Sequence, residues 1–322
     1  MAWQIIAILS LLAGVPVLAL AASPGIEHTL SDDTTFFAEG LDADARTGAL
    51  YITSLHHRNV FTADASGRLQ PLIKPGGAPI GGVFGVALDT RRDVAWVAAA
   101  RVPFMLPAPG DAIVRTELLR IALQDGRITG RWTLGDGTGM PGEIALAPDG
   151  SVLVSDGIGG VVHRLRSGAE TMEVVRSPLL RSPQGIAVDP SGAVAWIADW
   201  SRGIMRWDLR TDSITAVPTA DGTPMLGIDG LRAWHGRLIG VQNGRTPPRV
   251  VAIELAADGR RIERAETLDL PPATGESTVG TIVGDRYFYV SSSQWPFWSE
   301  QGARNESAGP LPVVTVREIM LR

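Results

Sequence analysis

Two acidic residues occupy matching places in this chain, because Glu39 and Asp229 each directly precede a glycine that leads into an apolar segment. If both carboxylates face one opening, about 5 Å apart at an effective dielectric near 20, they repel each other by roughly 3 kcal/mol. A cation between them, or a proton on one of them, removes that repulsion. The pair therefore predicts a site for a divalent cation such as Ca²⁺, which takes oxygen ligands and water.

Five other side chains could act on a small substrate beside such a site. His56 begins a His-His pair, and imidazole titrates near neutral pH, so it is a candidate catalytic base. Trp200 and Trp295 could line a pocket mouth, and Arg101 and Asn243 could contact a substrate. For each of them the alternative is an ordinary loop side chain, as it is for the two carboxylates.

Several other kinds of chemistry are excluded by what the sequence lacks. It has no cysteine, so disulfides, thiolate zinc sites and cysteine nucleophiles are ruled out. There is no G-x-S-x-G nucleophile elbow and no glycine-rich phosphate loop. The formal net charge is −5 and no basic stripe is present, so a nucleic-acid partner is not expected.

The elements that must position these residues follow from an internal repeat. Val-Ala-Trp-Val-Ala at 94–98 returns as Val-Ala-Trp-Ile-Ala at 194–198, each after a glycine-led apolar segment. With four weaker copies included, the repeat has six anchors, at residues 39, 84, 142, 184, 229 and 278. Apart from one step lengthened by a proline-rich insertion at 103–111, the spacing is about 40–50 residues, which is the period of propeller blades.

Each copy contains up to four short segments with strand chemistry, so the sequence predicts an all-β, six-bladed β-propeller with four-stranded blades. A strand near 313–319 lacks a partner, and we expect it to pair with residues 25–37 and close the ring. The loops then sort by face. The residues before each inner strand and those after each second strand, including all the candidates above, should gather at one mouth of the central channel.

The N-terminal segment has a separate character. Residues 5–20 form an apolar run that ends in a small-residue cleavage-like site, so we predict a signal peptide at 1–22 and one propeller domain at 23–322. An uncleaved membrane anchor is the alternative. The expected location is therefore periplasmic or secreted, with membrane contact only through an uncleaved leader.

Six such units, with Glu-Gly at 39–40 and Asp-Gly at 229–230, resemble the gluconolactonase/regucalcin (senescence marker protein) group of six-bladed propellers. Residues 183–192 are also similar to the NHL-type repeat. The resemblance implies a divalent cation, often calcium, bound by Glu39, by Asp229 and by two asparagines of middle blades. Gln184 stands in one asparagine position. Gly142 stands in the other, with Glu143 directly after it.

These observations together predict an exported lactonase- or esterase-like hydrolase that acts on a small lactone or ester. The cation would polarise the carbonyl and activate a water, with Asp229 as the general base and Glu39, Gln184 and Glu143 as further ligands. The alternative is a non-catalytic propeller that binds a small ligand or a protein on the same face.

Overall fold

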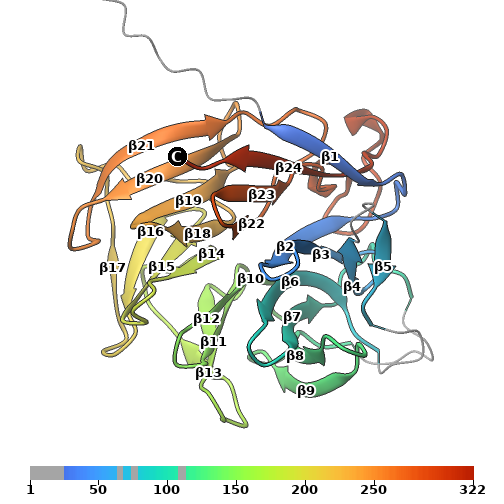
Figure 1. The fold of residues 1–322 in the computed structure, drawn as a ribbon, viewed down its shortest axis with the longest axis horizontal. Coiled ribbons are helices and arrows are strands. Elements are labelled where there is room, and N and C mark those ends of the chain that lie inside the picture. Colours follow the sequence, from blue (N-terminus) through green and yellow to red (C-terminus); the bar gives the residue numbers. More distant parts are fainter. Residues whose placement is uncertain (1–24, 64–67, 74–78, 108–113) are drawn as a thin grey trace, which may run out of the picture.

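The structure, a computed structural model, describes residues 25–63, 68–73, 79–107 and 114–322. They form six four-stranded antiparallel sheets arranged as blades around a central axis (Figure 1). The predicted all-β six-bladed propeller is therefore confirmed. The predicted signal segment at 1–22, and part of the insertion at 103–111, lie outside the described residues.

Each of the first five blades takes four consecutive strands, from the axis outward. Blade one holds β2 (Ala38–Asp44), β3 (Ala49–Ser54), β4 (Asn59–Ala63) and β5 (Leu69–Pro71). Blade two holds β6 (Gly82–Asp89), β7 (Val94–Ala100), β8 (Glu117–Ala122) and β9 (Ile128–Thr133). Blade three holds β10 (Pro141–Leu146), β11 (Val152–Asp156), β12 (Val161–Leu165) and β13 (Glu173–Val175).

The remaining blades follow the same order. Blade four holds β14 (Pro183–Val188), β15 (Val194–Asp199), β16 (Gly203–Asp208) and β17 (Ser213–Ala216). Blade five holds β18 (Leu231–Trp234), β19 (Arg237–Gln242), β20 (Arg249–Leu255) and β21 (Ile262–Asp269). Blade six holds β22 (Gly280–Val283), β23 (Arg286–Val290), β24 (Val314–Met320) and, outermost, β1 (Ile26–Ser31).

Ring closure uses the two ends of the described chain, as the sequence predicts. The N-terminal β1 pairs antiparallel with the C-terminal β24, with Ile26 opposite Glu318. A buried carboxylate ties this blade to blade five, because Asp269 accepts hydrogen bonds from the Tyr289 hydroxyl at 2.6 Å and from Arg317 Nε at 3.0 Å. This pairing supplies the fourth strand of blade six.

The repeated glycine of the inner strands has a packing cause. A Cβ added to Gly85 would lie 2.5 Å from the Gly142 carbonyl oxygen of blade three, and one added to Gly185 would lie 2.4 Å from the Asp229 carbonyl oxygen of blade five. The inner strands of neighbouring blades thus approach too closely for any side chain at this position. Glycine recurs at these positions because the neighbouring backbone leaves no room for a Cβ atom.

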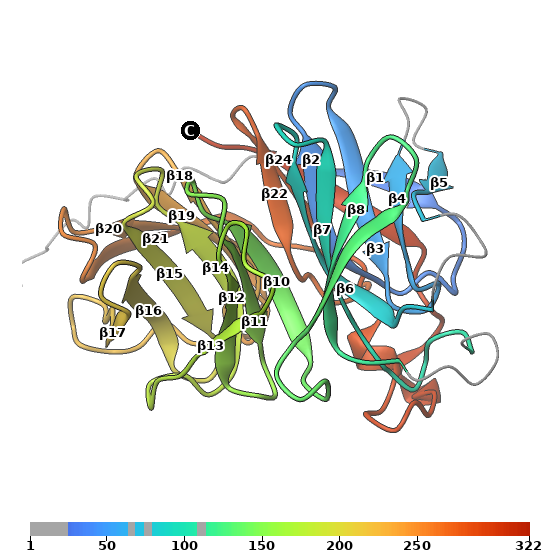
Figure 2. The same cartoon turned by 90° about the horizontal axis from the view of Figure 1, so that it is seen from below.

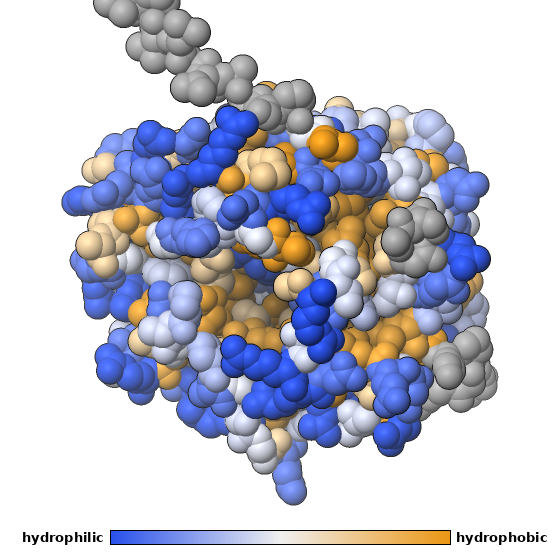
Figure 3. Space-filling model, viewed as in Figure 1, coloured by the Kyte–Doolittle hydropathy of each residue, from blue (hydrophilic) through white to orange (hydrophobic). Residues whose placement is uncertain are grey.

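Apolar side chains fill the spaces between blades. Trp96 of β7 packs with Ile144 and Val152 of blade three, and Trp207 of β16 is fully buried. In the space-filling view, apolar surface shows in the hollows toward the centre while hydrophilic residues cover the periphery (Figure 3). Both tryptophans therefore pack between blades, as their strand positions predict.

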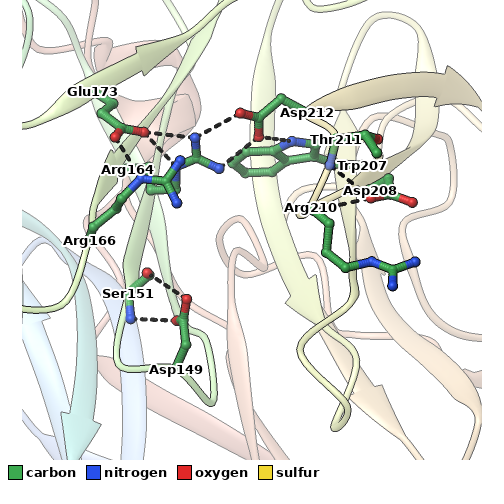
Figure 4. Close-up of polar contacts among 10 residues, drawn as sticks. All are labelled: Asp149, Ser151, Arg164, Arg166, Glu173, Trp207, Asp208, Arg210, Thr211 and Asp212. Carbon is green, nitrogen blue, oxygen red and sulfur yellow. Dashed lines mark hydrogen bonds and ion pairs between the residues drawn. The ribbon is translucent and has the colours of Figure 1, made fainter.

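One polar contact fastens two blades at their outer strands. The buried guanidinium of Arg164 on β12 pairs with Asp212 of blade four at 2.7 Å and also with Glu173 of its own blade, and it lies 5.4 Å from the centroid of the Trp207 ring (Figure 4). Trp207 Nε1 donates to the same Asp212 at 3.2 Å. The Arg164 guanidinium, the Trp207 ring and the Asp212 carboxylate thus form one contact between blades three and four.

Helical structure in the described chain is confined to two short 3-10 helices, Trp295–Phe297 and Glu306–Ala308. They lie in the segment between β23 and β24, at the end of the blades opposite the first hairpin turns (Figure 2). Within the described ranges no helix is long and apolar enough to cross a membrane.

Candidate functional site at the mouth of the central channel

A cavity of about 200 Å³ opens at the end of the central channel, where the loops before the inner strands meet. Carboxylates and amides form one part of its wall and apolar side chains form the other. The lining residues are Glu39, Phe84, Met140, Pro141, Gly142, Ser182, Gln184, Trp200, Asp229, Asn243, Glu276 and Trp295. Six of the nine side chains predicted by residue type and loop position thus line one cavity.

Glu39 lies at the start of the innermost strand of blade one. Its Oε2 accepts hydrogen bonds from Trp295 Nε1 at 2.7 Å and from Ser293 Oγ at 3.2 Å, both from the segment after β23. Burial, reinforced by the nearby charges of Asp229 and Glu276, raises the pKa of Glu39 well above its usual range. The mutual repulsion expected from the sequence is therefore present.

Asp229 faces a second carboxylate, Glu276, across the amide of Asn243. Asn243 Nδ2 donates to Asp229 Oδ2 at 2.8 Å and to Glu276 Oε1 at 2.9 Å. Burial raises the pKa of Asp229 to about 6, and burial together with the charge of Asp229 raises the pKa of Glu276 to about 7. Both groups therefore exchange protons close to neutral pH.

Trp200 fixes the orientation of that amide. Its indole Nε1 donates to Asn243 Oδ1 at 3.0 Å, so the amide oxygen faces the indole and the amide nitrogen faces the two carboxylates. The indole itself is 43% exposed and forms part of the cavity rim. Trp200, Trp295 and Asn243 thus lie where the sequence predicts, and each also orders an acidic group or its partner.

Gln184 and Gly142 occupy the two positions where the resemblance implies asparagine. A Cβ added to Gly142 would lie 3.2 Å from Gln184 Oε1. The longer amide of Gln184 therefore reaches toward the space that the missing Gly142 side chain leaves. Both residues line the cavity, so one amide is present where the resemblance implies two.

Glu143 has partners of a different kind. One carboxylate oxygen contacts the Arg232 guanidinium, and the other accepts the Leu231 backbone N–H at 3.1 Å. Burial lowers the pKa of Arg232, and both side chains line a deeper part of the channel. The carboxylate predicted as a cation ligand is therefore a member of a buried ion pair below the cavity.

His56 and Arg101 do not line the cavity. His56 Nδ1 lies 2.7 Å from the Phe104 carbonyl oxygen, in the loop that follows β7, and Arg101 is exposed directly after that strand. Both belong to the expected face of the propeller, but the loops of blades one and two hold them away from the channel axis. Neither side chain is therefore placed to act on a substrate in the axial cavity.

Glu276 is the acidic residue that the sequence alone does not single out. It precedes the most degenerate copy of the repeat, so no glycine follows it as one follows Glu39 and Asp229. Its position is set by a β-bridge to Ser293 in the loop after β23. The only signal in the sequence is its placement among the residues that lead into the last inner strand.

The donor chemistry of the cavity suits a hard divalent cation, because carboxylate and amide oxygens converge on it and no basic side chain lines it. Glu39, Asp229 and Glu276 each keep one oxygen without a hydrogen-bond partner among the described residues. Within those residues, however, no three His, Asp or Glu side chains are arranged as a ready-made ligand cluster. A cation would therefore need Gln184 and water as additional ligands.

The fold and the cavity define a six-bladed propeller with an acidic axial site. No protein-family model and no curated protein matches the sequence. Among solved structures it is similar to the calcium-binding protein regucalcin from Agrobacterium tumefaciens, with 17% identity, TM-score 0.62 and coverage of 93% of this chain and 96% of that one.

Two further structures show the same architecture with different activities in their names. A gluconolactonase from Xanthomonas campestris has 16% identity and TM-score 0.59, covering 92% of this chain and 90% of that one. Virginiamycin B lyase from Staphylococcus aureus has 15% identity and TM-score 0.59, covering 84% and 82%. At these identities the likeness establishes the fold, and at that level the resemblance to the gluconolactonase and regucalcin propellers is confirmed.

Proposed function

We propose that the protein is a hydrolase that opens small lactones or esters at the axial cavity. The observation that carries the proposal is the set of three carboxylates, Glu39, Asp229 and Glu276, placed in one small cavity with no basic side chain in its lining. Two of them have pKa values near neutral pH, as a general base and its partner require. The likeness to a gluconolactonase supports this choice at the level of fold.

The cavity also supports a bound divalent cation, most simply Ca²⁺. Glu39, Asp229 and Gln184 would hold it, and Glu276 adds a further oxygen at the same wall. When bound, the cation would supply polarisation of the substrate carbonyl and charge for the developing oxyanion. Burial raises the pKa values of Glu39 and Asp229, and a cation between the two carboxylates would favour their charged forms.

The residues of the chain supply the remaining steps. Asp229 accepts the proton of the attacking water, since it is ionised above a pKa of about 6 and lies at the cavity wall. Asn243 keeps Asp229 oriented through its 2.8 Å hydrogen bond. Trp200 and Trp295 pack against the substrate and exclude water from one side of it.

The apolar part of the wall suggests the class of substrate. Phe84, Met140 and Pro141 join the two tryptophans around the cavity, and behind them Phe37, Phe104 and Trp298 extend the apolar cluster. A sugar lactone would leave its hydroxyls facing this wall without partners. We therefore favour lactones or esters that carry an alkyl or aryl group.

Asp229→Asn tests the mechanism. The variant keeps an oxygen at the cavity but loses the base, so hydrolysis of an aryl or alkyl lactone should fall by roughly 10²-fold or more with the fold intact. Asp258→Asn, an exposed turn residue of the same blade, is the matched control and should keep full activity. If the parent hydrolyses nothing in a broad lactone and ester panel with added Ca²⁺, the hydrolase proposal fails and a binding role is favoured. Activity retained in Asp229→Asn would point to another base, with Glu276 tested next.

We also propose export to the periplasm or the medium, on the basis of the apolar N-terminal run and its small-residue end at 19–22. The absence of cysteine fits any redox compartment, so the leader alone carries this proposal. The intact mass of the protein purified from its own cells should correspond to a chain that begins near residue 23. A full-length mass in a cytoplasmic fraction would contradict it.

A further inference from the structure

A second cavity, of about 540 Å³, lies between blades two and three. Its lining includes Arg92 from the β6–β7 turn and residues 166–169 from the β12–β13 turn. These turns lie at the opposite end of the blades from the axial mouth, so the two cavities are separate. The volume falls in the range of sites for small molecules, about 300–1,000 Å³.

The floor of this inter-blade cavity is a row of side chains across blade two. Trp96 on β7 lies opposite Arg120 on β8, which lies opposite Gly130 on β9. A Cβ on Gly130 would lie 2.4 Å from the ring of Trp132, so the glycine leaves room for that indole against the sheet. The two indole rings are 5.4 Å apart, and the Arg120 guanidinium lies 6.0 and 5.8 Å from their centroids.

Blade four contains the same Trp–Arg pair with a different partner for the indole N–H. Trp196, the counterpart of Trp96 in the repeat, lies opposite Arg206. Its indole Nε1 donates to the Gly259 carbonyl oxygen at 3.2 Å, because the β20–β21 turn of blade five folds against it. In blade two, nothing among the described residues accepts a hydrogen bond from the indole N–H of Trp96 or Trp132. The two indoles thus differ in their hydrogen bonding.

The charge of the inter-blade cavity is the reverse of that of the axial one. Three guanidinium groups, those of Arg92, Arg120 and Arg166, line it, and no acidic side chain does. Arg92 and Arg166 each have one carboxylate partner outside the lining, at 2.6 and 2.7 Å, the second of which is drawn in Figure 4. Arg120 contacts only uncharged groups of Thr129, at 3.0 and 3.2 Å. In a chain of net charge −5, this is a localised anion-attracting site.

We propose that the inter-blade cavity binds a small aromatic carboxylate. The flat ring would stack on the partly exposed indole of Trp132, beside the small part of Trp96 that lines the cavity, where ring faces attract each other beyond simple burial. The carboxylate would accept charge-assisted hydrogen bonds from Arg120 and from Arg166 or Arg92. An uncharged aromatic ring would contact the indoles but not the guanidinium groups. A small anion without a ring would contact only the guanidinium groups. The site is independent of the hydrolysis proposed for the axial cavity.

Isothermal titration calorimetry with naphthalene-2-carboxylate tests this proposal. The parent protein should bind one equivalent with a Kd below about 1 mM, while 2-naphthamide and cyclohexanecarboxylate should each bind at least about tenfold more weakly. Arg120→Gln should weaken the carboxylate at least about tenfold and leave lactone hydrolysis unchanged. Arg206→Gln is the matched control, because the same residue type lies opposite Trp196 in the same blade position and outside this cavity.

Three results would overturn the proposal. The first is the absence of binding by the parent up to about 5 mM ligand. The second is equal binding of the carboxylate and its neutral amide, which would indicate a merely apolar gap. The third is equal weakening by the Arg120 and Arg206 substitutions, which would place the ligand elsewhere. If Arg120→Gln lowers the melting temperature too far to be titrated, Arg166→Gln at the exposed wall replaces it with the same expected result.

Discussion

At the scale of single residues, the axial cavity is governed by the cost of keeping carboxylates close together and away from water. Glu39 is stabilised by hydrogen bonds from Trp295 and Ser293, while Asp229 and Glu276 share the amide of Asn243. These bonds lower the pKa values of Glu39 and Asp229, but burial outweighs them and raises the pKa of all three carboxyl groups. A bound cation or a proton must therefore offset the remaining cost of burying these negative charges.

Calcium should therefore stabilise the folded protein. A ligand that binds only the folded state increases the free energy of unfolding by mass action, by about 2.7 kcal/mol at a ligand concentration of a hundred times Kd. The melting temperature rises as a result. Glu39→Gln should remove most of this response, because it takes away one charged ligand. Differential scanning calorimetry in chelator and in millimolar Ca²⁺ measures it, with Glu170→Gln on the surface as the control. Identical melting curves for the parent in both buffers would contradict a cation at this cavity.

The raised pKa of Glu276 gives a second expectation, for chelated protein. Between the ordinary carboxyl value of 4.5 and about 7, the folded state holds a proton that the unfolded chain has released. The free energy of unfolding should thus fall as pH rises through this window. Glu276→Gln removes the effect, so relative to the parent it should gain about 1–3 kcal/mol between pH 5 and pH 8.

Urea unfolding at the two pH values measures that gain, again beside Glu170→Gln. The substitution need not stabilise the protein at pH 5, because the parent is then protonated at this site as well. A stability difference that does not change with pH would mean that Glu276 titrates normally.

At the scale of elements, the inner strands determine where the functional groups lie. Gly40, Gly85, Gly185 and Gly230 let the inner strands of neighbouring blades meet backbone to backbone. The residue directly before each of these glycines lines the axial cavity or the channel below it. Gly185 shows this most clearly, since its N–H donates to the Asp229 carbonyl oxygen at 2.8 Å. The backbone of the proposed base is thus held by the strand of the preceding blade.

Gly185→Ala should therefore destabilise the fold and disturb the site. Its Cβ would lie 2.4 Å from the Asp229 carbonyl oxygen and equally close to the Leu231 nitrogen, both of which are backbone atoms that cannot turn away. We expect a loss of about 1–3 kcal/mol of unfolding free energy, the usual cost of overpacking, together with weaker hydrolysis.

Gly168→Ala is the comparison for that substitution. It lies in an open turn with nothing within 4 Å of the new Cβ, but its φ is +78°, so it carries only backbone strain of about 1 kcal/mol. Chemical denaturation of both variants measures the difference. Equal effects would show that the inner strands can separate to admit a methyl group.

At the scale of the whole molecule, the propeller is stabilised as a ring. Each blade buries its apolar face against the next one, and the last blade is completed only when β1 joins β24. The network around Asp269 joins that blade to blade five through Tyr289 and Arg317. A break at this place therefore exposes two blade faces at once.

Deletion of residues 313–322 should cause global unfolding. It removes β24, leaves β1 and β23 without their shared neighbour, and opens the ring. Circular dichroism and size-exclusion chromatography should show loss of the cooperative thermal transition and aggregation. A chain beginning at residue 25, which retains β1 and β24, should keep the transition. A folded monomer after the C-terminal deletion would mean that the blades do not depend on closure.

Much of this protein could be predicted from the sequence by itself. The repeat fixed the number of blades, because each copy must place a glycine where neighbouring inner strands touch. The alternation of apolar residues gave the strands, and the unpaired last strand predicted the closure. The order of loops around the ring then predicted that Glu39, Gln184, Asp229, Asn243 and both rim tryptophans would meet.

Only the tertiary structure decided what those residues contact. The ion pair of Glu143 with Arg232, the entry of Glu276 into the acidic cluster and the withdrawal of His56 from the axis all depend on contacts between blades far apart in sequence. The same holds for Trp96 and Trp196, which stand in nearly identical phrases. The next blade's turn accepts a hydrogen bond from the Trp196 indole, whereas Trp96 lines the inter-blade cavity, because a repeat encodes the blade itself but not the length and path of its neighbour's turn.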